Sequence, residues 1–311
     1  MGGGRFSSSD WASYSHSSGI DSATTADHIY TKKASEVHDD FLPINIKMRE
    51  SCDSVDNPNS TPISIWLDVT GSMGSVLTSC AKSLGTLFEE IYSRKPVSDP
   101  HIMFGGIGDV ECDQYPVQVT QFEADIRIAE QMKDIYFERG GGGNSYESYS
   151  AAWYFCAAHT AIDSLIKRGK KGYLFTLGDE EPTHVLSKND IKEFFGDDVQ
   201  HDYSSKELYE MVSKKYEVYH LIIEEGSHCR YYGDKVRSAW TDIIGQRAIP
   251  VSDHTKISEI IVSILEVEAG KKNKEEVINS WDGSTSIAVA KAIKDLMGTV
   301  PPADKDVILF N

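Results

Sequence analysis

The sequence predicts an α/β fold, with a doubly wound, mostly parallel sheet flanked by helices and an extension at each end. Two observations favour this class. Short apolar runs alternate with longer segments of helical apolar periodicity from residue 61 to about residue 268. The first apolar run, residues 63–69, leads directly into a long amphipathic segment. Strands that alternate with helices form parallel sheets covered on both faces, which bind ligands at the carboxyl ends of their strands.

The expected elements follow from these local patterns. Strands are predicted at residues 63–69, 101–107, 117–122, 172–177, 218–223 and 248–251, with a hairpin around residues 109–116. Helices are predicted at residues 75–93, 124–138, 146–167, 188–195, 205–215, 234–244 and 256–268. In the first of these helices the apolar side chains recur at helical spacing, which predicts one buried face: Val76, Cys80, Leu84, Leu87, Phe88 and Ile91.

Three units are expected along the chain: an N-terminal extension (1–60), a central domain (61–268) and a C-terminal helical extension (269–311). The first unit is rich in serine and glycine and poor in aliphatic residues, so it should be mobile unless it docks. Phe6, Trp11 and Tyr14 are its candidate anchors. In the last unit, residues 286–297 are amphipathic and are expected to pack back on the central domain. A partner-binding arm is the alternative.

Composition restricts the possible partners and location. The chain carries 31 basic and 48 acidic residues, a net charge of −17, which disfavours nucleic acid and anionic membranes as partners. The densest basic run, residues 167–171, is best explained as a solvated helix end. Five scattered cysteines form neither a zinc motif nor a disulfide framework, and no secretory signal or membrane-spanning run is present. A cytoplasmic protein is therefore expected.

Three segments suggest chemistry. In DVTGSM (residues 68–73), Asp68, Thr70 and Ser72 alternate in the turn after the first strand, where their oxygens can converge on a hard cation such as Mg²⁺. GGGGNSYE (residues 140–147) is a glycine-rich loop before a predicted helix. LGDEEPTH (residues 177–184) follows another strand. Taken singly, these segments are better explained as a helix cap, a flexible connection and a turn.

Together the segments resemble the von Willebrand factor A (VWA) domain with a metal-ion-dependent adhesion site (MIDAS), in the form found in intracellular microbial or phage proteins. The resemblance covers about residues 61–268 and implies a Rossmann-like fold. It implies metal-site residues at Asp68, Thr70, Ser72, Ser145 and Asp179. Tyr146 stands where the family commonly has proline, so Asn144 competes with Ser145 for the hydroxyl-loop position.

The resemblance also implies roles for these residues. Thr70 and Ser72 would bind the metal directly, while Asp68 and Asp179 would act largely through water. All-oxygen ligation favours Mg²⁺, Mn²⁺ or Ca²⁺ over zinc. Neutral hydroxyl ligands leave the cation poorly neutralised, so it would complete its coordination with an acidic residue of a partner protein. The expected function is a metal-dependent protein-binding module and not an enzyme.

Two other functions were weighed. A Mg²⁺-dependent phosphoryl hydrolase of the haloacid dehalogenase type would need a second carboxylate two positions after Asp68, where this chain has Thr70. An accessory subunit of an AAA+ ATPase is a role that microbial VWA proteins often take. The acidic loop with Asp109, Glu111 and Asp113 could hold a second cation or could be a solvated hairpin tip. Phosphate-binding-loop and serine-hydrolase motifs are absent from the sequence.

Overall fold

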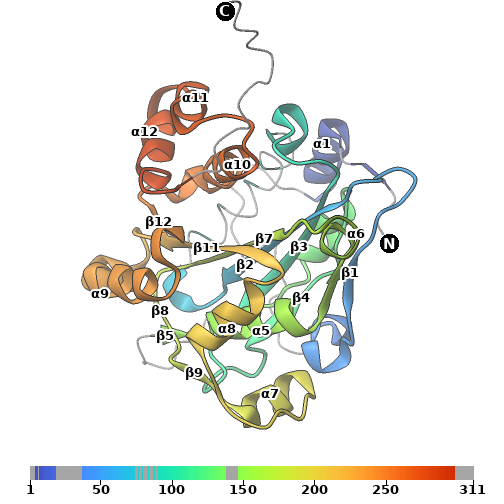
Figure 1. Ribbon diagram of the computed structural model, residues 1–311, viewed down its shortest axis with the longest axis vertical. Coiled ribbons are helices and arrows are strands. Elements are labelled where there is room, and N and C mark those ends of the chain that lie inside the picture. Colours follow the sequence, from blue (N-terminus) through green and yellow to red (C-terminus); the bar gives the residue numbers. More distant parts are fainter. Residues whose placement is uncertain are drawn as a thin grey trace, which may run out of the picture.

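The centre of the protein is a six-stranded sheet (Figure 1). The computed structural model describes residues 4–5, 7–18, 37–73, 90–137 and 146–297, together with Val76, Ser79, Ser83 and Leu87. The strand order is β12–β11–β7–β2–β3–β4, and every neighbouring pair is parallel except β3 and β4. The strands are β2 (Thr61–Asp68), β3 (Pro100–Ile107), β4 (Val117–Val119), β7 (Gly172–Gly178), β11 (Tyr216–Ile223) and β12 (Ala248–Val251). The predicted fold class and the predicted hairpin are thus confirmed.

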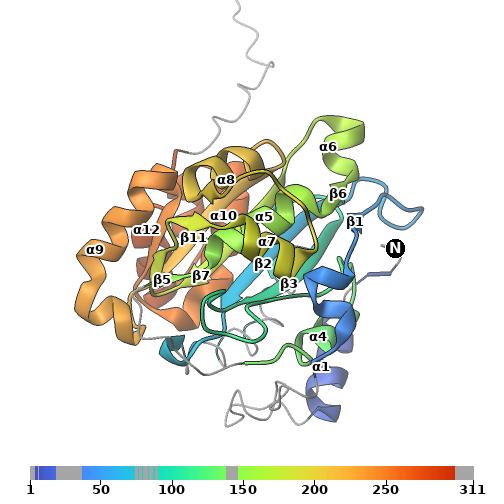
Figure 2. The same cartoon turned by 90° about the horizontal axis from the view of Figure 1, so that it is seen from below.

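Helices cover both faces of this sheet (Figures 1 and 2). Successive side chains of a strand point to opposite sides of the sheet, so both faces present apolar side chains that the helices bury. In β2, Ile65 and Leu67 join one buried apolar cluster and Trp66 joins the other. The first cluster includes side chains of α10 and α12, and the second includes side chains of α5, α8 and α9. The described helices are α1 (Ser8–Ser17), α4 (Arg127–Met132), α5 (Tyr149–Ala158), α6 (Asp163–Arg168), α7 (Lys188–Phe195), α8 (Ser205–Val212), α9 (Ser227–Ile244), α10 (Ile257–Glu268), α11 (Lys274–Asn279) and α12 (Gly283–Ala292).

The single helix predicted over residues 146–167 is wrong. The structure has four elements there: β5 (Tyr146–Glu147), α5, β6 (Thr160–Ile162) and α6. β6 pairs in parallel with β1 (Arg49–Ser51), and β5 pairs with β8 (Glu181–Pro182). Residues 146–147 and 160–162 are therefore strands, because they hydrogen-bond to distant segments of the chain, although their apolar spacing is typical of a helix. A further small ladder joins β9 (Val185–Leu186) to β10 (Tyr203–Ser204).

Other predicted helices differ mainly in length. The helix expected over residues 124–138 is reduced to α4, whereas α9 begins seven residues before the predicted start at residue 234. α9 is not regular, because Tyr232 has non-helical backbone angles inside it (φ −123°, ψ 20°). Val76, Ser79, Ser83, Leu87 and residues 90–94 are helical, as predicted for residues 75–93. Short 3₁₀ turns complete the chain: η2 (Asp39–Phe41), η3 (Pro43–Asn45), η4 (Gly71–Met73), η5 (Gly245–Arg247) and η6 (His254–Lys256).

Both chain extensions contribute to the core. In α1, Trp11 and Tyr14 pack against the apolar cluster, and the Tyr14 hydroxyl donates a hydrogen bond to the Ala129 carbonyl (2.9 Å). Phe6, the third predicted anchor, lies outside the described residues. After α10, the side chains of Val277 and Val289 are fully buried in the same cluster. The described part of the C-terminal segment therefore packs back on the domain.

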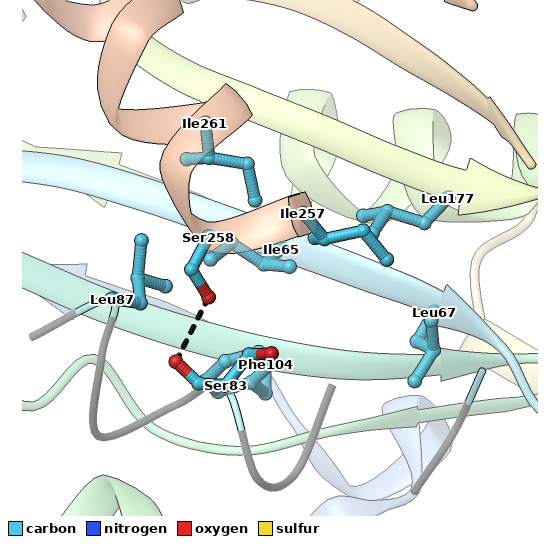
Figure 3. A pocket seen from close by; sticks show the side chains of 9 residues that line it. All are labelled: Ile65, Leu67, Ser83, Leu87, Phe104, Leu177, Ile257, Ser258 and Ile261. Atoms are coloured by element: carbon cyan, nitrogen blue, oxygen red, sulfur yellow. Dashed lines mark hydrogen bonds between the residues drawn. The ribbon is translucent and has the colours of Figure 1, made fainter. Parts of the chain in front are cut away.

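α10 lies against the sheet and the helix that contains Ser83 and Leu87. A small cavity of about 20 Å³, lined almost entirely by apolar side chains, remains between them (Figure 3). The Ser258 hydroxyl donates to the Ser83 carbonyl (2.8 Å) beside this cavity. In the part of the chain that the structure describes, each helix is too short or too polar to cross a membrane.

Candidate functional site

The candidate site lies at the carboxyl ends of β2 and β7. Asp68 is the last residue of β2, and Asp179 directly follows β7. These are neighbouring strands of the parallel sheet, with Leu67 opposite Leu177 in the register. Both aspartates are completely buried. Parallel topology thus brings together two carboxyl groups that are 111 positions apart in the sequence.

The turn after β2 is built around the Asp68 carboxylate. Its Oδ1 accepts hydrogen bonds from the backbone N–H of Thr70 (2.9 Å) and from the Thr70 hydroxyl (2.6 Å). The Thr70 and Ser72 hydroxyl oxygens lie 3.2 Å apart. An aspartate that binds the backbone two residues later stabilises a turn, and here it also fixes the position of the hydroxyl.

Asp179 closes the site from β7. Its Oδ1 accepts a hydrogen bond from the Ser72 hydroxyl (2.8 Å), and its Oδ2 accepts one from the backbone N–H of His228 in the first turn of α9 (2.8 Å). A Cβ at Gly226 would lie 2.2 Å from the Asp179 Cβ, so this approach of α9 requires glycine. His228 and Cys229 both belong to α9.

Tyr149 is a site residue that the sequence analysis missed. Its hydroxyl donates to Asp68 Oδ2 (2.8 Å), so both oxygens of this buried carboxylate have donors. The fully buried ring contacts the rings of His220 and Trp240. A Cβ at Gly178 would lie 1.9 Å from the Tyr149 hydroxyl, and this glycine therefore makes room for the contact. Position 149 fell inside the wrongly predicted long helix, which gave no signal that its side chain reaches the turn.

Two glutamates add further buried acid. Glu147 and Glu180 each have an Oε2 atom that is buried and, among the described residues, accepts no hydrogen bond. Burial and the negative charge of Asp68 raise the pKa of Glu147 to about 11 and that of Glu180 to about 8. Burial, followed by the charge of Asp179, raises the pKa of Asp68 to about 7. Each of these shifts reflects negative groups gathered in a dry region.

This donor set suits a hard divalent cation in composition and spacing. Adjacent ligands of an octahedral Mg²⁺ with bonds of about 2.1 Å lie roughly 3 Å apart, close to the 3.2 Å between the Thr70 and Ser72 hydroxyl oxygens. The four side chains of this set, Asp68, Thr70, Ser72 and Asp179, offer only oxygen ligands. No group of three or more His, Cys, Asp or Glu side chains suited to a metal ion occurs among the described residues. The candidate set relies instead on two hydroxyls and two carboxylates.

The other predicted site residues belong to the glycine-rich loop and to the acidic loop. Ser145 and its rival Asn144 lie outside the described residues. In the acidic loop, Asp109 Oδ1 accepts the backbone N–H of Glu111 (2.9 Å), and Asp113 Oδ2 accepts the backbone N–H of Asp109 (2.7 Å). These carboxylates therefore stabilise a turn.

Comparison with known proteins finds solved structures that share little sequence identity with this chain. No protein-family model matches the chain, and no curated protein is significantly similar to it. The chain is similar to the pilus adhesin SpaC from Lactobacillus rhamnosus GG in its open conformation (TM-score 0.47, 11% identity, 73% of this chain, 31% of the adhesin). It is also similar to a second crystal form of SpaC (TM-score 0.46, 12% identity, 73% and 31%). A third similar structure is the SpRpn10 VWA domain (TM-score 0.34, 10% identity, 57% and 82%).

The chain spans about a third of the adhesin's length. At these TM-scores the likeness assigns no function, so function is inferred from the geometry of the site.

Proposed function

We propose that this protein is a divalent-cation-dependent binding module that captures an acidic residue of a partner protein. Thr70 and Ser72 would hold Mg²⁺, Mn²⁺ or Ca²⁺ directly, and Asp68 and Asp179 would orient these hydroxyls and bind the cation through water. The observation that carries the proposal is the continuous chain of contacts from Asp68 through Thr70 and Ser72 to Asp179. The resemblance to the MIDAS motif adds Ser145 as a further hydroxyl ligand.

The chemistry of the ligands favours an acidic partner group. Thr and Ser hydroxyls are neutral, so a divalent ion held by them keeps much of its charge and attracts one more anionic oxygen. An aspartate or glutamate side chain of another protein supplies that oxygen at the rim of the sheet. A partner of the AAA+ ATPase class is compatible with this chemistry. A haloacid-dehalogenase-type hydrolase is the less favoured function, because position 70 offers no carboxylate to transfer a proton.

Isothermal titration with MgCl₂ and MnCl₂ tests the cation site. The full chain should bind one equivalent of cation, and Asp68→Asn and the double variant Thr70→Ala/Ser72→Ala should abolish binding. Asp242→Asn is the matched control, because Asp242 is an exposed carboxylate on α9. Absence of binding by the unaltered chain, or equal loss in the control, would refute the proposal.

Thermal unfolding gives an independent measurement. A ligand that binds only the folded state at 100 times its dissociation constant stabilises it by about 2.7 kcal/mol. For a chain of this size the melting temperature should rise by roughly 4 °C. EDTA should reverse the rise, and Asp68→Asn should show none. If the melting temperature of the unaltered protein does not change when the cation is added, the folded protein has no such metal site.

The nature of the partner is tested by capture from a lysate with and without EDTA. Capture should require the cation, and it should be inhibited by a short peptide containing Asp or Glu but not by the matching Asn or Gln peptide. The hydrolase alternative predicts Mg²⁺-dependent cleavage of a generic phosphate ester that Asp68→Asn abolishes. Such turnover would replace the binding-module proposal.

A further inference from the structure

A second site is suggested at the opposite end of the sheet. A cleft of about 580 Å³ lies at the amino ends of β2, β7 and β11, where Thr61, Tyr173 and Glu217 line it. β2 has eight residues, so at about 3.3 Å per residue its two ends are roughly 25 Å apart. The cleft is therefore separate from the Asp68–Asp179 site. Its volume lies within the range of small-molecule pockets, roughly 300–1,000 Å³.

The cleft collects positive charge in a protein that is strongly acidic overall. Among the described residues, five cations and two carboxylates, Glu217 and Glu268, line it. The cations come from three places in the chain: Arg168, Lys170 and Lys171 before β7, Arg247 in η5, and Lys271 after α10. A local excess of cations against a net charge of −17 indicates an anion-binding surface.

Part of this charge has a structural purpose. Arg168 pairs with Asp53 (2.6 Å) and donates to the Ser60 carbonyl, so it fastens the segment before β2. Arg247 pairs with Glu217 (2.5 Å) and lies over the Tyr219 ring. Contacts within the protein therefore explain the positions of these two arginines without a bound ligand. Lys171 lies 3.3 Å from Glu217 and is more exposed.

Two exposed lysines and one buried serine in the cleft make no such contacts within the described residues. The ammonium groups of Lys170 and Lys271 pair with no described carboxylate, although both residues line the cleft. Ser164 also lines it; this side chain is 97% buried (3% exposed), and its hydroxyl makes no hydrogen bond within the described chain. Buried hydroxyls normally have partners. An oxygen-rich anion in the cleft would provide one.

We infer that this cleft binds a phosphorylated small molecule of nucleotide size, with its phosphates at Lys170, Lys271 and the Ser164 hydroxyl. Phosphate oxygens accept hydrogen bonds from ammonium groups and hydroxyls alike. The apolar part of the lining, Pro96, Val97 and Met297, with Tyr173, offers a surface for the uncharged part of the ligand. The small volume and mixed lining favour such a ligand over an extended macromolecule.

Calorimetric titration of the full chain with ATP and with sodium tripolyphosphate tests the inference. EDTA is present throughout, so that the proposed cation site makes no contribution. Both compounds should bind, and raising the NaCl concentration should weaken binding, because the interaction is ionic. Tighter binding of ATP identifies contacts to the nucleoside, whereas equal affinities assign recognition to the phosphates alone; both results support the inference. No binding of either compound at millimolar concentration would overturn it.

Two variants locate the site. Lys170→Ala/Lys271→Ala should weaken binding about tenfold or more, which corresponds to about 1.4 kcal/mol. Lys188→Ala/Lys206→Ala removes the same charge from two exposed lysines on α7 and α8 and should leave affinity unchanged. An equal loss of affinity in the two double variants would show that binding depends only on the net charge of the protein, and it would overturn the assignment of the ligand to this cleft.

Ser164→Ala gives the most specific readout. Because the hydroxyl has no partner in the described chain, its removal should leave the melting temperature unchanged while weakening ligand binding roughly three- to tenfold. Unchanged affinity in this variant would remove Ser164 from the site.

Sedimentation with phosphatidylserine vesicles provides the last comparison. Binding to vesicles without binding to tripolyphosphate would overturn the small-molecule assignment in favour of a membrane surface.

Discussion

At the scale of single residues, Asp68 shows how a buried carboxylate is kept in place. A charged group removed from water is costly unless hydrogen-bond donors compensate for the lost hydration. Asp68 receives three donors: the Thr70 N–H, the Thr70 hydroxyl and the Tyr149 hydroxyl. Even so, burial and the charge of Asp179 raise its pKa to about 7. Its state of protonation is therefore sensitive to any change in these contacts.

Tyr149→Phe tests this sensitivity. The substitution removes one donor to Asp68, so the carboxyl pKa should rise further, and the protonated form should persist to higher pH. Since a metal ligand must be deprotonated, Mg²⁺ affinity should fall, and the loss should be larger at pH 6.5 than at pH 8.5. Calorimetric titration at the two pH values measures the effect. Equal affinities of the variant and the unaltered chain at both pH values would show that Tyr149 does not support the site.

Residue patterns predicted part of this arrangement. Alternation along the turn placed Thr70 and Ser72 together, and the position of Asp179 after a strand placed it at the same sheet edge. Their role as metal ligands remains a prediction. Tyr149 and Glu147 could not be found in this way, because their contribution depends on the break at Ser148, which separates β5 from α5. Periodicity over residues 146–167 concealed that break.

At the scale of elements, a group of polar and aromatic contacts around Trp281 joins the C-terminal helices to the domain. The guanidinium of Arg94 lies 3.5 Å from the Trp281 ring centroid, and its Nη1 donates to the Ser280 hydroxyl (2.7 Å). The Trp281 indole N–H in turn donates to the Ser263 hydroxyl of α10 (2.8 Å). α11 and α12 are therefore connected both to α10 and to the helix that ends near Arg94. The sequence predicted a helical extension from residue 269, and α11 begins there at Lys274.

Trp281→Ala should weaken this connection. The variant loses apolar packing, the stacked cation and one hydrogen bond, and we expect a loss of about 2 kcal/mol in the free energy of unfolding. Urea denaturation followed by circular dichroism measures it. Ile287→Ala on α12 is the control, because that side chain is 63% exposed and its loss should matter little. A comparable loss in both variants would argue against a special contribution from Trp281.

At the scale of the whole molecule, buried histidines make folding sensitive to pH. His101 at the start of β3 is completely buried, and His220 in β11 stacks on Trp240 with ring centroids 3.4 Å apart. Burial lowers the pKa of His101 to about 4, and it lowers that of His220 well below the usual value. Both rings remain neutral in the folded protein under conditions where the unfolded chain binds a proton.

The sign of the effect follows from this difference. Well above pH 6.5 neither histidine is protonated in either state, and their contribution to stability is fully present. As pH falls through 6.5 towards 4, the histidines of the unfolded chain take up protons first, so this contribution is lost. For His101 alone this amounts to about 2 kcal/mol at pH 5. The buried carboxyls with raised pKa act in the opposite direction in both proteins, so between pH 7.5 and 5 the melting temperature of the unaltered chain should fall more, or rise less, than that of His101→Gln, and parallel curves would exclude His101.

Comparing the unaltered chain with His101→Gln separates the effect of His101 on stability from that of the carboxyl groups that titrate in the same pH range, because both proteins contain these carboxyl groups. His201→Gln, at an exposed position, reports the effect of losing a solvated histidine.

The overall sheet topology was predictable because alternating apolar strands and amphipathic helices permit few arrangements. The tertiary contacts that bury His101 and His220 were not predictable, since they depend on which side chains cover each strand.

The two outer strands of the central sheet have a consequence for how this protein can meet other molecules. β12 has four residues and contains Pro250, and β4 has three residues and runs antiparallel to its neighbour. Short edges and a proline, which has no N–H to donate, offer little backbone for another strand to pair with. A partner would therefore be recruited by side chains and loops and not by extending the sheet. The same edges protect the molecule from edge-to-edge aggregation at high concentration.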